Sequence, residues 1–459
     1  MKSTGPQIDG PTQILNVSDI IDSRPMSRFQ VRTILLGGLV LFADGFDAQT
    51  IGFLAPSISE TTAIPIDTFG PVFSSSLIGL MIAAMLAGPI ADRWGRKWPI
   101  IFSTSALAVF SFLTAFSTSF TQFLVLRFLT GLGLGGALPN VVALASEYVP
   151  KRLMAVLVSV LFCGLPLGGF VCGMLSSLML SAWGWQSVFY LGGILPLIIS
   201  ILLVLLLPES VQFLSQERKD PKKIAKLMTP IAPEIDAAGN QISFLAPVEK
   251  HEGVPVKFLF KEGRAFGTVI LWIPNFMNLL LMYVILNWLP ALLKEAGMTG
   301  SGGVTATAFF SLGGILGTLA EGFLIKFGGP FRILLAEFGL CGLFIVSMSL
   351  TADSWGLVVI LAFLLGFLVI GAQAGLNVLA ANFYPTFVRS TGVGWALGIG
   401  RIGSILGPTL AGMLWALQWE PQQILLAGVV PAVLALAAVL PGRWTRGGGS
   451  PYAAISGSK

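Results

Sequence analysis

Long apolar segments alternate with short polar ones along almost the whole chain. From Leu153 to Pro208 there is no Asp, Glu, Lys or Arg. A helix needs about 20 mostly apolar residues to cross a bilayer, and a water-soluble fold could not bury so long an uncharged run and still keep a solvated surface. The pattern predicts twelve membrane helices, near residues 31–55, 70–91, 98–117, 121–147, 155–180, 185–207, 266–291, 303–326, 331–351, 355–383, 390–416 and 422–441. The predicted fold class is therefore an all-α integral membrane protein.

The composition agrees with this prediction. Of the 459 residues, 54% are hydrophobic and 11% are charged, against about 25% charged in soluble domains. The three cysteines all fall in apolar segments, which favours free buried thiols over a disulfide framework. No metal-ligand cluster, nucleophile motif or cofactor loop stands out, so we expect neither an enzyme nor a cofactor, and no nucleic-acid partner.

Positive charges fix the expected orientation, because cytoplasmic loops of membrane proteins are enriched in Lys and Arg. With the N-terminus inside, the predicted external loops keep only Lys294. Both termini are then cytoplasmic. The expected organisation is a cytoplasmic segment 1–30, a six-helix bundle 31–207, a cytoplasmic linker 208–265 with short amphipathic helices, a second six-helix bundle 266–445 and a flexible tail 446–459. His251, the one histidine, falls in the linker as a solvated loop residue.

An internal repeat relates the two predicted bundles. Asp44 and Asn278, Pro56 and Pro290, Gly88 and Gly322, and Gly95 and Gly329 all stand 234 positions apart. Parallel repeats of six helices are typical of secondary transporters, whose substrate lies between the halves near the bilayer midplane. The glycines and prolines recur in both halves but the charges do not, so the unpaired charges are candidates for an asymmetric ligand.

The first predicted span carries two such charges, Asp44 and Asp47. Asp44 stands twelve residues past Arg32, roughly 18 Å into the membrane, where an ionisable residue is functional by default. Carboxylates at i and i+3 share a helix face and repel each other when both are ionised, which favours one bound proton. We expect a proton-coupling pair, and the alternative is a structural pair satisfied by the backbone or by arginine.

Two arginines also fall within predicted spans. Arg401 lies among glycines twelve residues beyond Arg389, and its guanidinium fork matches a carboxylate; it could instead form an internal ion pair with Asp44 or Asp47. Arg127 lies about 9 Å from the outer end of the fourth span. Polar and aromatic side chains that could line the same cavity, or only hold helices together, are Asn278, Tyr283, Gln373, Asn377 and Trp395. For Glu321 and Glu337 we expect snorkelling or pairing with Lys326 or Arg332.

The loop between the second and third spans reads GPIADRWGRK at 88–97 and resembles the major facilitator superfamily signature G-x-x-x-D-R-x-G-R-K. We expect Gly88 to permit close helix approach, Gly95 to form a tight turn and Asp92 to latch the two halves together. In the second half Lys326 stands in place of the aspartate, which argues against a symmetric latch. The predicted cytoplasmic gate comprises Gly88, Asp92, Arg93, Gly95, Arg96, Glu147, Arg152 and Arg389.

Further motifs resemble one branch of that superfamily, the aromatic acid:H⁺ symporters. They are DGFDAQTIGFLAP at 44–56, ALPNVVALASEYVP at 137–150 and RSTGVGWALGIGRIGSILGP at 389–408. The resemblance covers most of the chain except the tail. It implies small aromatic carboxylates as substrates, and it places Asp44, Asp47, Arg127, Glu147, Arg389 and Arg401 on the family's charged positions.

The function expected from these features is proton-driven import of an aromatic acid by a monomeric carrier in a bacterial inner membrane, powered by the proton gradient. Asp44 or Asp47 would carry the proton, and Arg401 would bind the carboxylate. Three alternatives stay open at this point: a symporter for aliphatic carboxylates or other metabolites, a proton-coupled exporter, and a membrane receptor that does not transport.

Overall fold

The computed structural model describes residues 13–216, 221–233, 242–245, 256–261, 263–298, 300–351, 354–385 and 388–443. The first twelve residues, the tail 446–459 and His251 lie outside the described residues, so the expectations placed on them stay predictions.

Within the described residues, twelve helices or helix pairs are long and apolar enough to cross a membrane, as the sequence predicted. In the N-terminal half they are α2 (Arg28–Thr62), α3 (Phe69–Trp94), α4 (Lys97–Thr114), α5 (Phe120–Tyr148), α6 (Lys151–Phe162) continued by α7 (Gly164–Trp183), and α8 (Trp185–Leu206). In the C-terminal half they are α12 (Ala265–Glu295), α13 (Gly302–Gly328), α14 (Pro330–Leu350), α15 (Trp355–Phe383), α16 (Arg389–Ala416), and α17 (Pro421–Ala427) continued by α18 (Val429–Val439).

Local signals start and stop these helices. Ser27 and Ser119 cap α2 and α5, each in a capping box with the glutamine three residues later, an arrangement that satisfies two backbone groups at the helix start. Gly95 and Gly329 precede α4 and α14 at equivalent places, with φ of 81° and 74°. Only glycine adopts such angles without strain, so the tight turn expected at Gly95 is confirmed.

The structure repeats its packing contacts as well as its sequence. A Cβ added at Gly79 of α3 would strike the carbonyl oxygen of Phe128, and one added at Gly313 of α13 would strike that of Phe363. The reverse contacts, Gly131 on Ser76 and Gly366 on Phe310, are duplicated in the same way. The pairs α3–α5 and α13–α15 therefore approach each other backbone to backbone through the same glycines.

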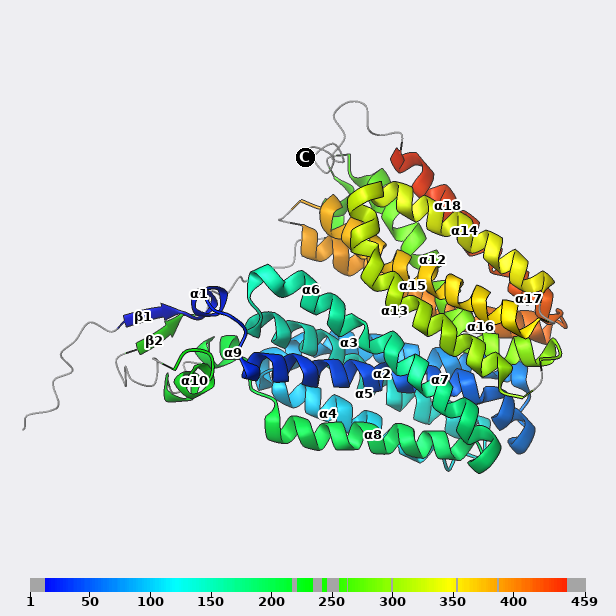
Figure 1. Cartoon of the computed structure of the whole chain (residues 1–459), viewed down its shortest axis with the longest axis horizontal. Helices are drawn as coiled ribbons and strands as arrows, with labels where there is room; N and C mark the ends of the chain where they lie inside the picture. Colours follow the sequence, from blue (N-terminus) through cyan, green and yellow to red (C-terminus); the bar gives the residue numbers. More distant parts are fainter. Residues whose placement is uncertain are drawn as a thin grey trace, which may run out of the picture.

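Two bundles lie side by side in Figure 1, the N-terminal one in blue to green and the C-terminal one in green to red. We call the end where α2 begins and α8 ends the linker end, and the opposite end the far end. The bundles diverge toward the linker end and converge at the far end (Figure 1). Contacts between the halves run through α3–α16, α7–α13 and α2–α12.

Side chains join the two halves in the far-end portions of these helices. Ser74 Oγ donates to Ile405 O at 2.6 Å and lies 2.8 Å from Thr409 Oγ1. Ser311 Oγ donates to Gln49 Oε1 at 2.8 Å. Near the helix ends, Lys294 Nζ and Glu60 Oε1 form an ion pair at 2.6 Å. The halves are thus held together at the far end.

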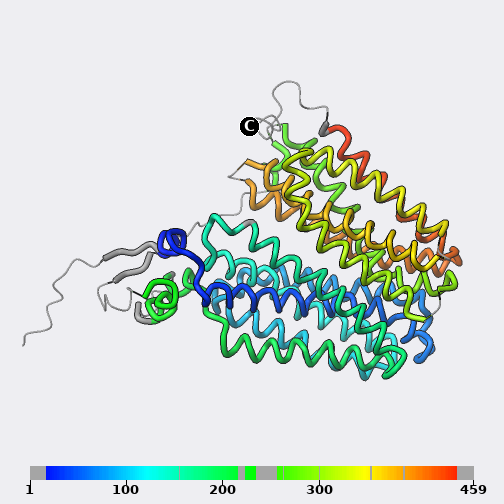
Figure 2. Tube along the Cα trace, viewed as in Figure 1, coloured from blue at the N-terminus to red at the C-terminus, as the bar shows by residue number. Residues whose placement is uncertain are grey.

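The linker end carries short elements outside the spans. The helices α1 (Val17–Asp22), α9 (Val211–Gln216) and α10 (Pro221–Met228) lie there (Figure 2). The strands β1 (Gln13–Asn16) and β2 (Ile242–Leu245) lie beside them (Figure 1). The two strands pair in parallel, Gln13 opposite Ile242. This small sheet is an addition to the all-α architecture that the sequence predicted, because the apolar spans say nothing about pairing between the N-terminal segment and the linker.

Candidate functional site

Asp47 and Arg127 form a closed, buried ion pair inside the N-terminal bundle. Arg127 Nη1 lies 3.0 Å from Asp47 Oδ2, and both side chains are 1% exposed. Ser111 Oγ donates to the other oxygen of Asp47 at 2.6 Å. On its second side the guanidinium donates to the hydroxyls of Thr114 and Thr130, each at 3.1 Å.

An aromatic ring completes the surroundings of this pair. The Arg127 guanidinium carbon lies 5.2 Å from the Phe189 ring centroid, in cation–π range. Both carboxylate oxygens of Asp47 and both terminal nitrogens of Arg127 therefore have partners within one bundle, and Arg127 Nε is buried without one. The sequence placed Asp47 in the proton site and Arg127 in the substrate site; the structure brings the two together and gives each a partner in the same half.

Asp44 differs from Asp47, one helical turn away on α2. Its side chain is buried, at 5% exposure, yet within the described part of the chain no group donates a hydrogen bond to it and no cation forms an ion pair with it. The charges whose fields act on Asp44 are Arg401 and Asp47. Asp44 is thus a buried carboxyl group that interacts electrostatically with Arg401 but forms no ion pair with any described residue.

Arg401 of α16 belongs to the opposite half and is half-buried. Its Nη1 donates to the hydroxyl of Tyr283 on α12 at 3.3 Å. Among the described residues no carboxylate pairs with it, so the fork of its guanidinium is available to a ligand. The prediction that Arg401 and Tyr283 share one site is consistent with this contact.

Amide side chains of α12 and α15 form a hydrogen-bonded row in the same half. Asn278 Nδ2 donates to Gln373 Oε1 and to Val369 O, each at 3.0 Å. Gln373 Nε2 donates to the amide oxygens of Asn275 at 3.1 Å and Asn377 at 3.3 Å. Asn278 Oδ1 is buried without a donor. Asn278 is the repeat counterpart of Asp44, so the position that carries a carboxyl group in one half carries a neutral amide in the other.

Trp395 lies elsewhere on α16. It stands six residues before Arg401, which turns it roughly 120° around the helix from that side chain. It stacks on Trp272 of α12, with ring centroids 5.9 Å apart and planes at 20°. The structure therefore does not bring Trp395 to Arg401.

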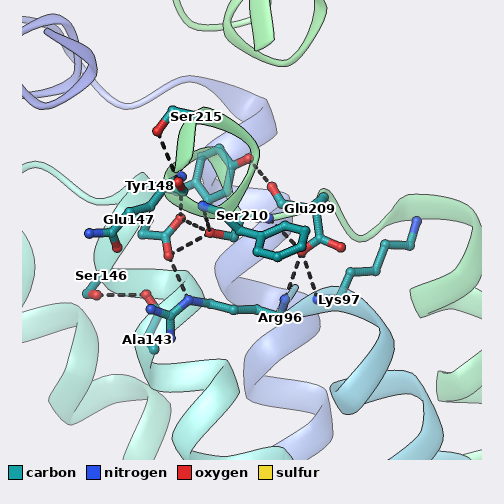
Figure 3. Close-up of polar contacts among 11 residues, drawn as sticks. Arg96, Lys97, Ala143, Ser146, Glu147, Tyr148, Glu209, Ser210 and Ser215 are labelled. Atoms are coloured by element: carbon teal, nitrogen blue, oxygen red, sulfur yellow. Dashed lines mark hydrogen bonds and ion pairs between the residues drawn. The ribbon is translucent and has the colours of Figure 1, made fainter. Parts of the chain in front are cut away.

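The predicted gate residues gather only in part, and inside one half (Figure 3). Arg96 Nε pairs with Glu147 Oε1 at 2.7 Å, and Ser210 Oγ donates to the same carboxylate at 2.6 Å. Glu209, which the sequence analysis missed, accepts from the backbone N–H groups of Arg96 at 2.8 Å and Lys97 at 3.1 Å. Glu209 thereby stabilises the positive N-terminus of α4.

The other gate residues do not join this cluster. Asp92 and Arg93 are exposed. Arg152 donates to Arg24 O at 2.8 Å, and Arg389 donates to Tyr384 O at 3.3 Å. In this conformation the cluster of Arg96, Glu147, Glu209 and Ser210 ties α4, α5 and the start of the linker together.

One expectation for the gate is wrong. Gly88 was expected to permit close helix approach, but a Cβ added there would meet no atom within 4 Å, and the same holds for its repeat partner Gly322. Both glycines stand near the linker end of their helices, where the halves diverge. The close approach is made instead by glycines deeper in the spans, such as Gly79 and Gly131.

No group of three or more His, Cys, Asp or Glu side chains among the described residues is placed to hold a metal ion. The charged side chains described within the spans include Asp44 and Arg401, which belong to opposite halves, and the Asp47–Arg127 pair inside the N-terminal bundle. Such an arrangement can bind a proton and an anionic group.

Comparisons with known proteins agree with this geometry. The sequence matches the Major Facilitator Superfamily over residues 37–408. The 4-hydroxybenzoate transporter PcaK of Pseudomonas putida is 39% identical over 428 residues, which cover 93% of this chain and 95% of that protein. A gallate transporter of the same species is 37% identical, covering 90% of this chain and 91% of its own length.

A solved structure shows the same fold. A bacterial homologue of the human lysosomal transporter Spinster superposes with a TM-score of 0.68 at 17% identity, over 92% of this chain and 98% of that one. The chain belongs to the Major Facilitator Superfamily, and the relatives it matches along most of its length are named as aromatic acid transporters.

Proposed function

We propose that the protein imports small aromatic carboxylates together with protons, by alternating access. The carrying observation is the separation of Asp44 from Arg401: a buried carboxyl group and a half-buried guanidinium on opposite halves, acting on each other without an ion pair. Buried charges in a membrane bundle cost several kcal/mol unless they are paired or serve a ligand. A ligand carboxylate on Arg401 and a proton on Asp44 would leave both positions neutral.

The relatives supply the substrate class. Proteins named as transporters of 4-hydroxybenzoate and gallate are similar to this chain along nearly its whole length. The substrate carboxylate would bind the fork of Arg401 beside the Tyr283 hydroxyl, and ring hydroxyls would reach the amides of Gln373 and Asn377. The proton gradient would drive transport, so no cofactor is needed. The carrier would work as a monomer.

The direction of opening follows from the proposed topology. The basic linker end faces the cytoplasm of a bacterial inner membrane, with both termini on that side. The halves are joined at the far end in this structure, so this conformation would release substrate inward. In the outward-facing state the halves would close at the linker end, and Asp92, Arg93, Arg152 and Arg389 would then contact the other half.

Proton coupling gives Asp44 the role of carrier, and the Asp47–Arg127 pair then holds α2 in place beside it. A proton that binds to the Asp47 carboxylate would have to break its contact with Arg127, with Ser111 or with both. An anion carried with one proton is electrically neutral, so only additional protons would draw on the membrane potential, at about 2.3 kcal/mol per charge per 100 mV.

The deciding experiment is uptake of labelled 4-hydroxybenzoate into proteoliposomes with an imposed pH gradient, with and without a protonophore. We expect wild-type accumulation to collapse with the protonophore. Asp44→Asn should lose accumulation but keep exchange of internal for external substrate. Asp67→Asn, at the far end, is the matched control and should behave as wild type.

Three results would contradict the proposal. They are normal accumulation by Asp44→Asn, equal competition by aliphatic acids, and a pH change of opposite sign when substrate is added, which would indicate export.

A further inference from the structure

A second pair of carboxyl groups lies inside the C-terminal bundle, away from the site described above. Glu321 of α13 and Glu337 of α14 each stand seven residues from the linker end of their helices, about 10 Å along the axis. They are 1% and 4% exposed. The sequence-based expectation that they snorkel, or pair with Lys326 or Arg332, is wrong, because both side chains point into the bundle.

The surroundings of this pair are apolar and closely packed. Gly375 of α15 lies so close that an added Cβ would strike Glu321 Oε1, and Leu334 borders the same point. Neither carboxyl group receives a hydrogen bond from any described residue, and all four oxygens are buried without a donor. The two side chains are within hydrogen-bonding reach of each other, but two ionised carboxylates have no proton to share.

No cation offsets these groups in the described part of the chain. The charge of Glu321 acts on Glu337, and the only side chain that interacts electrostatically with Glu321 among the described residues is Glu337. Lys326 and Arg332 are exposed on their own helices, and α15, α17 and α18 contain no ionisable side chain. Cys341 of α14, one turn after Glu337, is the other titratable group facing the pair.

Ionisable groups on the remaining neighbours of α13 point to other partners. On α12, Lys294 pairs with Glu60, Tyr283 accepts from Arg401 and Glu295 is exposed. Arg264, just before this helix, donates to Phe258 O. On α6 and α7, Lys151 pairs with Asp22, Arg152 donates to Arg24 O and Cys172 contacts Thr50.

Two adjacent anions cannot stay in such a place, because each uncompensated buried charge costs several kcal/mol and like charges repel. A single proton removes one charge and turns one oxygen into a donor. The resulting O–H···O⁻ bond is of the short, charge-assisted kind. We propose that Glu321 and Glu337 form a second proton-binding site, in the C-terminal bundle, that holds at least one proton at neutral pH.

The fold itself does not require this pair. At the repeat offset of 234, Ala87 and Ser103 stand in the N-terminal half where Glu321 and Glu337 stand in the C-terminal half. Neither of those residues is ionisable. The site is also separate from Asp44, because the charges that act on Asp44 are those of Arg401 and Asp47.

Infrared spectroscopy of the purified full chain in lipid nanodiscs tests the proposal directly. At neutral pH, the carbonyl-stretch band of protonated carboxyl groups should lose intensity in Glu321→Gln/Glu337→Gln. The loss should be the same on an Asp44→Asn background, because the two sites are separate. Glu295→Gln, at an exposed position, is the control and should leave the band unchanged. A band unaffected by the double substitution would overturn the proposal.

The pH dependence of thermal unfolding gives a second readout. In the folded protein the pair keeps a proton that the unfolded chain releases once the pH exceeds the ordinary pKa of a carboxyl group. Stability should therefore fall as pH rises, and the unfolding constant should increase by up to about tenfold per pH unit for each proton. The double glutamine variant should show a flatter profile between neutral and alkaline pH. Parallel profiles would count against the site.

The single variants keep the test valid if the double variant does not fold. In Glu321→Gln or Glu337→Gln the new amide can donate to the remaining carboxyl group. Each single variant should then shift and weaken the infrared band relative to wild type. An unchanged band in both would overturn the proposal.

Discussion

At the scale of single residues, the structure separates charges that look alike in the sequence. Asp44 and Asp47 stand one turn apart, and Arg127 and Arg401 are both membrane arginines. Asp47 and Arg127 pair with each other and contact three hydroxyls. Among the described residues Asp44 has no such partner, and Arg401 contacts the Tyr283 hydroxyl but no carboxylate. The ion pair between Asp47 and Arg127 explains why two charges can be buried in the N-terminal bundle. Asp44 and Arg401, which form no ion pair with each other, are where a ligand can bind.

Breaking the closed pair should destabilise the protein. Asp47→Asn or Arg127→Gln alone leaves a buried charge unpaired, at a cost of about 3–5 kcal/mol. Asp47→Asn/Arg127→Gln removes both charges and should cost clearly less than the sum. Chemical unfolding in detergent completes the double-mutant cycle. Strict additivity would show that the two side chains do not stabilise each other.

The Tyr283 hydroxyl should contribute to ligand affinity through Arg401. Tyr283→Phe removes one hydrogen bond from the guanidinium, worth about 1 kcal/mol, or roughly fivefold in the dissociation constant. Arg401→Lys should weaken binding more, since an ammonium lacks the planar fork. Calorimetric titration with 4-hydroxybenzoate measures both. Unchanged affinity in the two variants would place the carboxylate elsewhere.

At the scale of elements, glycines set the spacing of the spans. The pairs α3–α5 and α13–α15 place glycine Cα atoms against carbonyl oxygens of the facing helix. Without a hydrophobic driving force between helices in lipid, such close packing carries much of the association. The contact between Gly95 and Glu209 also requires a glycine, because a Cβ at Gly95 would strike the Glu209 carboxylate that caps α4.

Gly131→Ala should therefore lower stability, by about 1–3 kcal/mol of overpacking, and Gly366→Ala should do the same in the second bundle. Gly339→Ala is the control, because a Cβ there would meet nothing within 4 Å and alanine favours a helix. Melting temperatures of the purified proteins measure the difference. Equal effects at Gly131 and Gly339 would show that packing is not the cause.

At the scale of the whole molecule, the two bundles are joined at the far end and diverge toward the linker end (Figure 1). The Ser74–Thr409 contact and the Lys294–Glu60 ion pair both cross the interface. A carrier must break these contacts to open the far side, so they mark one state of the transport cycle.

Locking this interface should stop transport. The hydroxyl oxygens of Ser74 and Thr409 are 2.8 Å apart, so Ser74→Cys/Thr409→Cys places two thiols within bonding distance. Oxidation should abolish uptake and reductant should restore it, while each single cysteine variant should transport under both conditions. Undiminished uptake by fully cross-linked protein would show that the far end does not open.

The sequence by itself determined the twelve spans, the duplication and the identity of the buried charges, because apolar length and residue type are local properties that any bilayer imposes. Only the tertiary structure decided how those charges are partnered. The contacts Asp47–Arg127, Arg96–Glu147 and Glu321–Glu337 depend on how helices distant in the chain are rotated against each other, and no local pattern encodes that rotation. The same reason explains why Glu209 was missed, Gly88 was misread and Trp395 lies apart from Arg401.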